Sequence, residues 1–396
     1  MQITKEQAKK FLLAHHSISP SYKLRGKEGI LKYIDRVGCI QFDPLDKVGY
    51  NPYLVLQSRI EDFKPEYLAE LLYSDRMLLD GWDKNMAIYS ASDWPYFKRY
   101  REDEYRRYGD KSDINKILPV VRQTISEKGP LSSIDLEFDT LVDWAWAPTR
   151  ASRAALESMY FWGELIVHHR VGTRKFYDFA EKYISSDLIS MQDPNFAMEQ
   201  FFQWNVKRRI GAVGLLWGRP SDAWLGIRWM KSKERGEALS LLKDAGEVLP
   251  IEVEGIKHAF YIRREEEPLL HEVIKGIEEE PQASFIAPLD NLLWDRKQIK
   301  EVFGFEYTWE VYKPVSQRKY GYYVLPVLYG DKFAARFEPR FDKKTRKLHI
   351  INWWWEPDAI VTKEMKQALS SCFERFMNYL EAADMQFDGG TDKITI

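Results

Sequence analysis

The residues best suited to chemistry lie in the short stretch GCIQFDP at residues 38–44. The stretch has the apolar character of a buried strand, in which side chains alternate, so Gln41 and Asp43 share one face and Phe42 takes the other. Burying a carboxylate among apolar neighbours is costly, so we expect the pair to face water or a substrate. Asp43 could then accept a proton from a water molecule that Gln41, both donor and acceptor, holds in line.

The same carboxylate also has a structural interpretation. The dipeptide Asp43-Pro44 is typical of the start of a turn, where an aspartate caps backbone N–H groups. From these residues alone the turn is the favoured interpretation, and the water-activating site is the alternative.

Composition describes a globular protein of several domains. The chain has 396 residues, of which 45% are hydrophobic and 30% charged, and this length predicts two to four domains. It has no apolar run of 18 residues, and its first residues lack the apolar core of a signal peptide, so we expect a cytoplasmic protein without a membrane partner. Cys39 and Cys372 form no CxxC pattern, which predicts two reduced thiols in packed surroundings.

Several chemistries lack their local signatures. The chain contains no GxxxxGK[ST], GxGxxG after a strand, GxSxG or HExxH motif, which argues against nucleotide hydrolysis, dinucleotide redox chemistry, serine hydrolysis and zinc proteolysis. The pairs His15-His16 and His168-His169 are adjacent in sequence, and adjacent side chains diverge. We therefore expect neither a metal site nor a cofactor.

The charges are unevenly distributed, although the net charge is only −2. Residues 207–235 hold eight basic and two acidic residues, and residues 313–347 hold ten basic and three acidic. The acidic runs 265–267 and 278–280 are interpreted as solvated linker helix between domains. Basic stretches interleaved with Trp and Tyr favour a polyanion partner as much as they favour a solvated face.

The order of predicted elements repeats along the chain. Residues 114–179 predict a helix, a short helix after Pro130, a longer helix from Ser152 and two strands around Gly172, which is the order of a winged helix. Residues 195–263 repeat that order, with the hairpin around Gly255. The first hundred residues fit it too, with helices over 4–16 and 26–38 and a strand over 39–43.

After Pro281 the chain changes to short segments rich in β-branched and aromatic residues, which we interpret as strands and which include residues 307–313, followed by a helix over 362–383. This texture predicts a small antiparallel barrel or sandwich with a closing helix. The predicted fold class is therefore α+β, with winged-helix domains over 1–108, 109–190 and 191–281 and a β-barrel domain over 282–396.

Two features of this last domain allow two interpretations each. Trp353, Trp354 and Trp355 could form a platform for stacking bases, but alternating Trp on a strand is more often core. The hairpin over 334–350 has a basic tip, which suits a nucleic-acid backbone and equally a solvated loop.

Motifs along almost the whole chain resemble those of the YcaQ-like, or AlkZ/AlkX-type, winged-helix DNA glycosylases. They are GCIQFDPLD, SRAALESMYFWGELIVHHRVGTRKFYD, APLDNLLWDR, FGFEYTWEVYKP, RKYGYYVLPVLYGD and INWWWE. The resemblance implies tandem winged helices followed by a small β-barrel, and excision of alkylated purines, including those in interstrand crosslinks. The family motif is Gln, an apolar or aromatic residue, then Gln or Asp, and residues 41–43 have the Asp form of the AlkX branch.

The resemblance makes Asp43 and Gln41 the predicted catalytic residues. An N3- or N7-alkylated purine is already a cationic leaving group, so Asp43 acts as general base and stabilises the charge developing at C1′, while Gln41 positions the water. The predicted partner is double-stranded DNA with alkylated or crosslinked purines, bound by a monomeric, nucleoid-associated protein that needs no cofactor.

Lys84 stands where many relatives have the histidine of a Tyr-Trp-x-His stretch, and is expected to take its place as a phosphate ligand. The remaining predicted DNA contacts are all basic side chains: Arg150, Arg153, Arg208, Arg209, Lys231, Lys233, Arg318, Arg340, Lys343, Lys344 and Arg346.

Two other classes of protein fit the basic helices. A non-enzymatic winged-helix transcription regulator would use them to read operator bases, with residues 41–43 as a structural turn, an effector pocket and a symmetric dimer. A chromatin-like binder would bind DNA without preference for a lesion.

Overall fold

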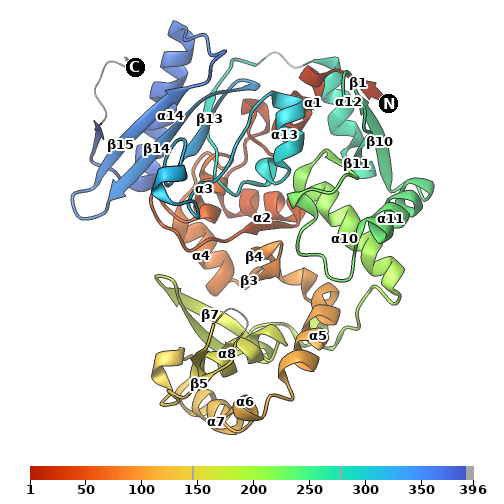
Figure 1. The fold of residues 1–396 in the computed structure, drawn as a ribbon, viewed down its shortest axis with the longest axis vertical. Helices are drawn as coiled ribbons and strands as arrows, with labels where there is room; N and C mark the ends of the chain where they lie inside the picture. The colour runs from red at the N-terminus through yellow and green to blue at the C-terminus, as the bar shows by residue number, and fades with distance from the viewer. Residues whose placement is uncertain (145–146, 277–278, 389–396) are drawn as a thin grey trace. The chain divides into compact units, whose positions relative to one another are not determined.

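The computed structural model describes residues 1–144, 147–276 and 279–388 (Figure 1). The chain folds into two compact units. The larger unit contains residues 1–67, 82–88 and 198–396, and the smaller contains 68–81 and 89–197. Helix α4 (Pro65–Tyr73) and the strands β3 (Leu78–Asp83) and β4 (Asn85–Ser90) contain residues of both units.

The first two helices of the larger unit form where the sequence predicts them. Helix α1 (Lys5–His15) begins at a capping box, in which the Thr4 hydroxyl accepts from the Gln7 amide and the Gln7 side chain accepts from the Thr4 amide. Helix α2 (Gly26–Val37) buries its apolar face and ends at Gly38, whose φ of 75° favours glycine. The predicted stop at Gly38 is thus confirmed.

The other helices that lie wholly in the larger unit are α3 (Asn51–Gln57), α10 (Met198–Val213), α11 (Ser232–Asp244), α12 (Glu267–Lys275), α13 (Arg296–Phe303) and α14 (Lys363–Leu380).

A four-stranded sheet of the larger unit has the order β1-β10-β11-β9. Its strands are β1 (Gln2–Ile3), β9 (Leu216–Trp217), β10 (Val248–Val253) and β11 (Phe260–Arg263). The β10–β11 hairpin was predicted, and it follows α10, a short 3-10 turn and α11 in the predicted order. The sequence did not predict β1, which pairs in parallel with β10, because the two strands are about 250 residues apart.

The C-terminal sheet is a half-barrel of five strands, β12 (Ala283–Phe285), β13 (Leu325–Tyr329), β14 (Lys332–Asp342), β15 (Lys347–Trp355) and β16 (Asp384–Phe387). The predicted closed antiparallel barrel is wrong in two respects. Strands β12 and β16 are the two edges of this sheet in the described residues, and β16 pairs in parallel with β15. Helix α14 follows β15, and its residue Phe373 contacts the sheet through Phe285 and Phe337 (Figure 1).

Packing decides between the two interpretations of Trp353. This side chain belongs to the core, because it is buried against Phe337 and Phe373.

The predicted strand over 307–313 is wrong. The buried Glu310 carboxylate accepts from the backbone amides of Lys319 and Tyr320 instead, which folds this segment into a loop.

The acidic run at 265–267 is also not simply solvated linker. Glu266 is buried, and its carboxylate lies 3.1 Å from His15 Nδ1 and also accepts from Arg263. Residue 278 of the second acidic run lies outside the described residues.

The smaller unit holds the helices α5 (Lys98–Tyr108), α6 (Ser112–Asn115), α7 (Leu118–Lys128), α8 (Ala151–Phe161) and α9 (Ser186–Ser190). Its strand pairs are β5 (Leu141–Val142) with β6 (Thr149–Arg150), and β7 (Leu165–Val171) with β8 (Arg174–Phe179). Helices α7 and α8 and the β7–β8 hairpin were predicted, and they enclose a core that includes Val121, Ile125, Leu156 and Met159. The short helix predicted after Pro130 is a 3-10 turn, Ser133–Asp135.

Candidate active site

The predicted catalytic motif, residues 41–43, lies at the end of strand β2 (Cys39–Gln41), which follows α2 directly. The strand stops at Gln41, where the Phe42 amide still donates to the Met86 carbonyl of β4 at 2.8 Å. Asp43 therefore lies in the following loop, residues 42–50, which we call the motif loop. The predicted strand alternation extends to Gln41 and no further.

Two asparagines fix the backbone of β2. Asn51 at the start of α3 donates its side-chain amide to the Gln41 carbonyl at 2.8 Å, and Asn291 donates to the Cys39 carbonyl at 2.9 Å. Asn51 also accepts from the Leu289 amide at 3.1 Å, so it joins the motif to a segment more than 230 residues away. Both asparagines are buried, and their hydrogen bonds restrict how the strand can move.

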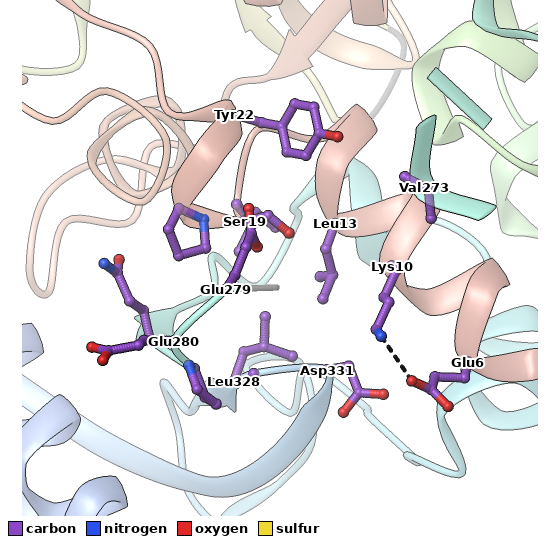
Figure 2. A pocket seen from close by; sticks show the side chains of 15 residues that line it. Glu6, Lys10, Leu13, Ser19, Tyr22, Val273, Glu279, Glu280, Leu328 and Asp331 are labelled. Carbon is purple, nitrogen blue, oxygen red and sulfur yellow. Dashed lines mark ion pairs between the residues drawn. The ribbon is translucent and has the colours of Figure 1, made fainter. Parts of the chain in front are cut away.

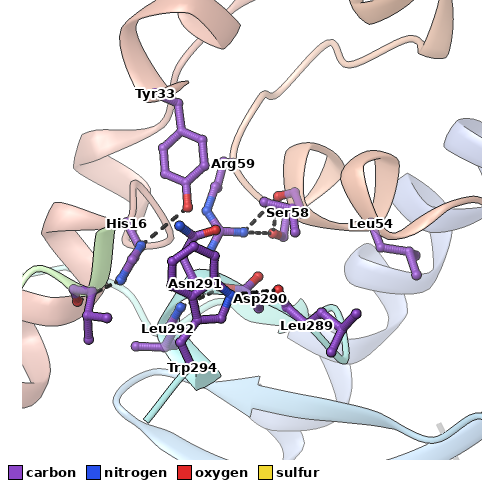
Figure 3. A network of polar contacts seen from close by, with 12 residues as sticks. His16, Tyr33, Leu54, Ser58, Arg59, Leu289, Asp290, Asn291, Leu292 and Trp294 are labelled. Atoms are coloured by element: carbon purple, nitrogen blue, oxygen red, sulfur yellow. Dashed lines mark hydrogen bonds and ion pairs between the residues drawn. The ribbon is translucent and has the colours of Figure 1, made fainter. Parts of the chain in front are cut away.

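A buried ion pair holds the segment that carries Asn291. Figure 3 shows the Arg59 guanidinium directed at Asp290, with a separation of 2.6 Å. Both side chains are fully buried, and Arg59 also stacks on the Tyr33 ring and donates to the Ser58 hydroxyl. This buried network holds the segment of Asn291, whose side chain donates to the Cys39 carbonyl of β2.

Gln41 has an unpaired polar atom. Its side chain is only 6% exposed, and its Oε1 has no hydrogen-bond partner among the described residues. A buried acceptor without a hydrogen-bond partner costs about 1–3 kcal/mol of stability. Such an atom calls for an explanation, and a catalytic role is one of those known. The position of Gln41 is consistent with an amide held ready for a water or a substrate atom.

Asp43 combines the two interpretations of the sequence. Its Oδ1 accepts from the Leu45 amide at 2.9 Å, so the predicted turn is present. Its Oδ2 has no hydrogen-bond partner among the described residues, and the side chain is half-buried. Burial raises the pKa of the Asp43 carboxyl above its ordinary value, and the Leu45 hydrogen bond opposes this only partly. One oxygen thus fixes the side chain, and the other remains available as a base.

The motif loop is attached to the C-terminal sheet and helix. The Lys47 carbonyl accepts from the Phe341 amide of β14 at 2.8 Å, and Lys343 forms an ion pair of 2.6 Å with Asp46. The Tyr379 hydroxyl of α14 donates to the Val48 carbonyl at 3.1 Å. The predicted basic hairpin between β14 and β15 therefore lies beside the motif loop.

Arg208 and Arg209, predicted as phosphate contacts, serve a different partner. Arg208 Nε lies 2.6 Å from one oxygen of Asp83, and Arg209 Nη1 lies 2.7 Å from the other. Arg208 also donates to the Gly38 carbonyl at 2.8 Å, which ties α10 to the start of β2. Arg209 is buried, and both guanidinium groups pair with the single Asp83 carboxylate, so the three side chains together keep one positive charge. Contact of Arg208 and Arg209 with DNA stays a prediction.

Lys84 follows Asp83 at the turn between β3 and β4. It is 6% exposed, and its ammonium lies 4.9 Å from the centre of the Trp294 ring. Burial, reinforced by the charge of Arg209, lowers the pKa of Lys84 to about 8. Its role as a phosphate ligand remains a prediction.

The other predicted DNA contacts are surface residues with different partners. Arg340 and Lys344 are exposed, and no acidic partner of either lies among the described residues. Arg346 donates to the Glu381 carbonyl, and Arg318 donates to the Lys313 carbonyl and stacks on Tyr322. The remaining four are exposed: Lys231, Lys233 near Glu237, Arg150 paired with Asp139, and Arg153 paired with Glu157.

One cavity of the larger unit has the opposite electrostatic character. The cavity has a volume of about 580 Å³, and its lining includes four acidic residues and one lysine, Lys10. Figure 2 shows Lys10 paired with Glu6. The other acidic residues are Glu279, Glu280 and Asp331. Such a lining repels a polyanion, so this cavity is not a candidate for the DNA site.

No cluster of residues that could hold a metal ion occurs in the described part of the chain. Among the helices of that part, none has the length and apolarity needed to cross a bilayer.

The sequence did not identify Asn51, Asn291 or Asp83 as parts of the site. Asparagine is common at turns and helix starts, and no spacing marks these two as partners of β2. Asn291 belongs to the motif APLDNLLWDR, but the motif alone does not indicate which strand its amide contacts.

An accessible carboxylate next to a buried amide, beside a hairpin with exposed cations, defines a class of site suited to hydrolysis within a polyanion. Comparison with known proteins gives the family: the sequence profile of the DNA glycosylase AlkZ-like family matches residues 34–379. The chain belongs to this family and is a DNA repair glycosylase. Its fold is similar to that of Streptomyces sahachiroi DNA glycosylase AlkZ, with a TM-score of 0.63 and 13% identity over 98% of this chain and 100% of that one.

Proposed function

We propose that this glycosylase hydrolyses the N-glycosidic bond of purines made cationic by alkylation at N3 or N7. Asp43 accepts the proton of the attacking water and stabilises the positive charge that develops at C1′, while Gln41 orients the water. The products are the free alkylated base and an abasic site, so one water is consumed for each bond broken.

The observation that carries the proposal is the pairing of Asp43 and Gln41. Asp43 accepts from the Leu45 amide through Oδ1, and its Oδ2 has no hydrogen-bond partner among the described residues. Two residues earlier, the buried Oε1 of Gln41 has none among them either. A base needs both a defined position and an accessible oxygen, and Asp43 has both. The enzyme is then monofunctional, because water and not a protein amine attacks the sugar.

The leaving group decides the proposed specificity. A cationic purine departs as a neutral molecule and needs no proton from the enzyme, whereas a neutral lesion such as hypoxanthine needs an acid. Asp43 cannot serve as that acid while it acts as the base. The site therefore suits cationic lesions and excludes neutral ones.

The finer family traits belong to the same proposal. The Gln-aromatic-Asp form of residues 41–43 suggests an AlkX-like enzyme that unhooks N7-linked interstrand crosslinks. Residues 1–108, 109–190 and 191–281 act as winged-helix domains that bind the duplex in this proposal, and the order of their helices and hairpins supports it.

A panel of duplexes, each with one lesion, tests the proposal through the yield of alkali-sensitive sites. We expect cleavage at 7-methylguanine and at an N7-linked crosslink, but not at uracil, hypoxanthine or 8-oxoguanine. Efficient release of hypoxanthine would refute the leaving-group argument. Excision of 7-methylguanine without unhooking would limit the enzyme to monoadducts.

A further inference from the structure

Among the described residues of the larger unit, Tyr312 is the most exposed large hydrophobic side chain. It is 83% exposed, and Val315 of the same loop is 77% exposed. The loop, residues 310–320, also contains Lys313, Arg318 and Lys319. An exposed aromatic ring beside cations is the combination that binding sites for unpaired nucleobases use.

Hydrogen bonds hold the two ends of this loop together although its tip is exposed. The buried carboxylate of Glu310 accepts from the amides of Lys319 at 3.2 Å and Tyr320 at 2.9 Å, and from Lys313 Nζ at 2.8 Å. The Tyr312 ring packs edge-to-face against Trp309 at 5.9 Å between ring centres. This contact supports one edge of the ring and leaves most of it exposed.

Contacts also join the loop to the catalytic motif. The Tyr322 ring lies between two cations, with Arg318 of this loop at 4.9 Å and Lys47 of the motif loop at 5.3 Å. These two contacts place the loop that carries Tyr312 beside the motif loop. Burial, and after it the charge of Asp43, raises the pKa of Tyr312, which agrees with this placement.

We propose that Tyr312 stacks on a nucleobase at the lesion, next to the glycosidic bond that the water activated by Asp43 cleaves. Aromatic faces accept any base, and glycosylases must disturb base stacking to reach their target. The cations beside the ring suit the phosphates that flank such a base. The inference rests on the proposed function, because it takes the reacting nucleotide to lie at Asp43.

The test uses the full-length protein and a duplex with an uncleavable tetrahydrofuran abasic analogue flanked by 2-aminopurine. Binding of the wild type should change the 2-aminopurine fluorescence. Tyr312→Ala should abolish that change and weaken binding to this duplex ~5- to 150-fold, the range that base–aromatic stacking spans. Tyr312→Phe should behave as the wild type, because it keeps the ring.

Val315→Ala is the matched control, since it removes an exposed apolar side chain from the same loop. An unchanged affinity in Tyr312→Ala, or an equal loss in Val315→Ala, would overturn the proposal, as would a loss that is equal on intact duplex. The assay needs no excision, so failure of the proposed chemistry would appear only in the lesion panel.

Discussion

Asp43 and Asp83 lie near opposite ends of strand β2 and have opposite environments. Asp83 contacts Arg208 and Arg209, and although burial opposes ionisation, these two charges hold its pKa below the ordinary range. No cationic partner of Asp43 lies among the described residues, and burial raises its pKa. The comparison shows how one residue type suits two purposes: an ion-paired carboxylate stabilises the fold, and one without a cationic partner suits the proposed role of a base.

The largest effect is expected on catalysis. Asp43→Asn keeps the shape and the hydrogen bond from Leu45 but removes the base, so excision of 7-methylguanine should fall about 10²- to 10⁴-fold. Single-turnover kinetics measure this, with DNA affinity as the control.

The same variant should not be less stable at neutral pH. The folded-state pKa of Asp43 is raised, so its ionisation destabilises the fold as pH rises from the ordinary aspartate range through the raised value. Replacing it with a neutral amide removes that penalty. Full activity, or a marked loss of stability, in Asp43→Asn would contradict the assignment.

The second prediction concerns Asp83, where the same substitution is expected to reduce stability. Asp83→Asn leaves two guanidinium groups without their counter-charge, so the free energy of unfolding should fall by about 3–5 kcal/mol in urea titrations. The contribution of Asp83 is fully present above the ordinary aspartate pKa and is lost as pH falls below it, because its folded-state pKa is lowered. A variant as stable as the wild type would show that the pair contributes nothing.

The third prediction concerns the pH profile of excision. The base must be ionised, and the Asp43 pKa is raised, so kcat/KM should fall with decreasing pH at values above the ordinary aspartate range. The profile must be measured above the pH at which protonation of Asp83 destabilises the protein. An acid limb at or below the ordinary aspartate pKa would point to a different base.

The smallest effect is expected at the hairpin. Changing Arg340 and Lys344 to Gln should weaken binding to damaged and undamaged duplex alike, and should reduce the salt slope by about 0.9 for each phosphate that the hairpin no longer neutralises. Lys363→Gln, an exposed position at the start of α14, is the control. An unchanged slope in the double variant would reject the role of the hairpin.

Local signals predicted the helices better than the sheets. Apolar spacing and Gly38 placed α2 correctly, because both act within one element. The strand predicted over 307–313 failed because one carboxylate, Glu310, organises the segment as a loop. Likewise β16 pairs with a strand about 37 residues earlier, a long-range contact that no periodicity reveals.

For the candidate site, the sequence drew attention to residues 41–43, because an amide and a carboxylate in an apolar segment conflict with burial. It did not indicate the ion pairs of Arg208 and Arg209, since a count of basic residues cannot show that both pair with Asp83, 125 residues earlier than Arg208. The supports at Asn51 and Asn291 are likewise visible only after folding.

The attachment of the motif loop has a consequence for biosynthesis. The loop is near the N-terminus, yet its backbone is held through Leu289 by way of Asn51, through Phe341 and through Tyr379. A ribosome emits the catalytic residues early and these supports much later, and long-range contacts form slowly. We therefore expect a nascent or prematurely terminated chain that ends before Tyr379 to lack contacts that hold the motif loop in place.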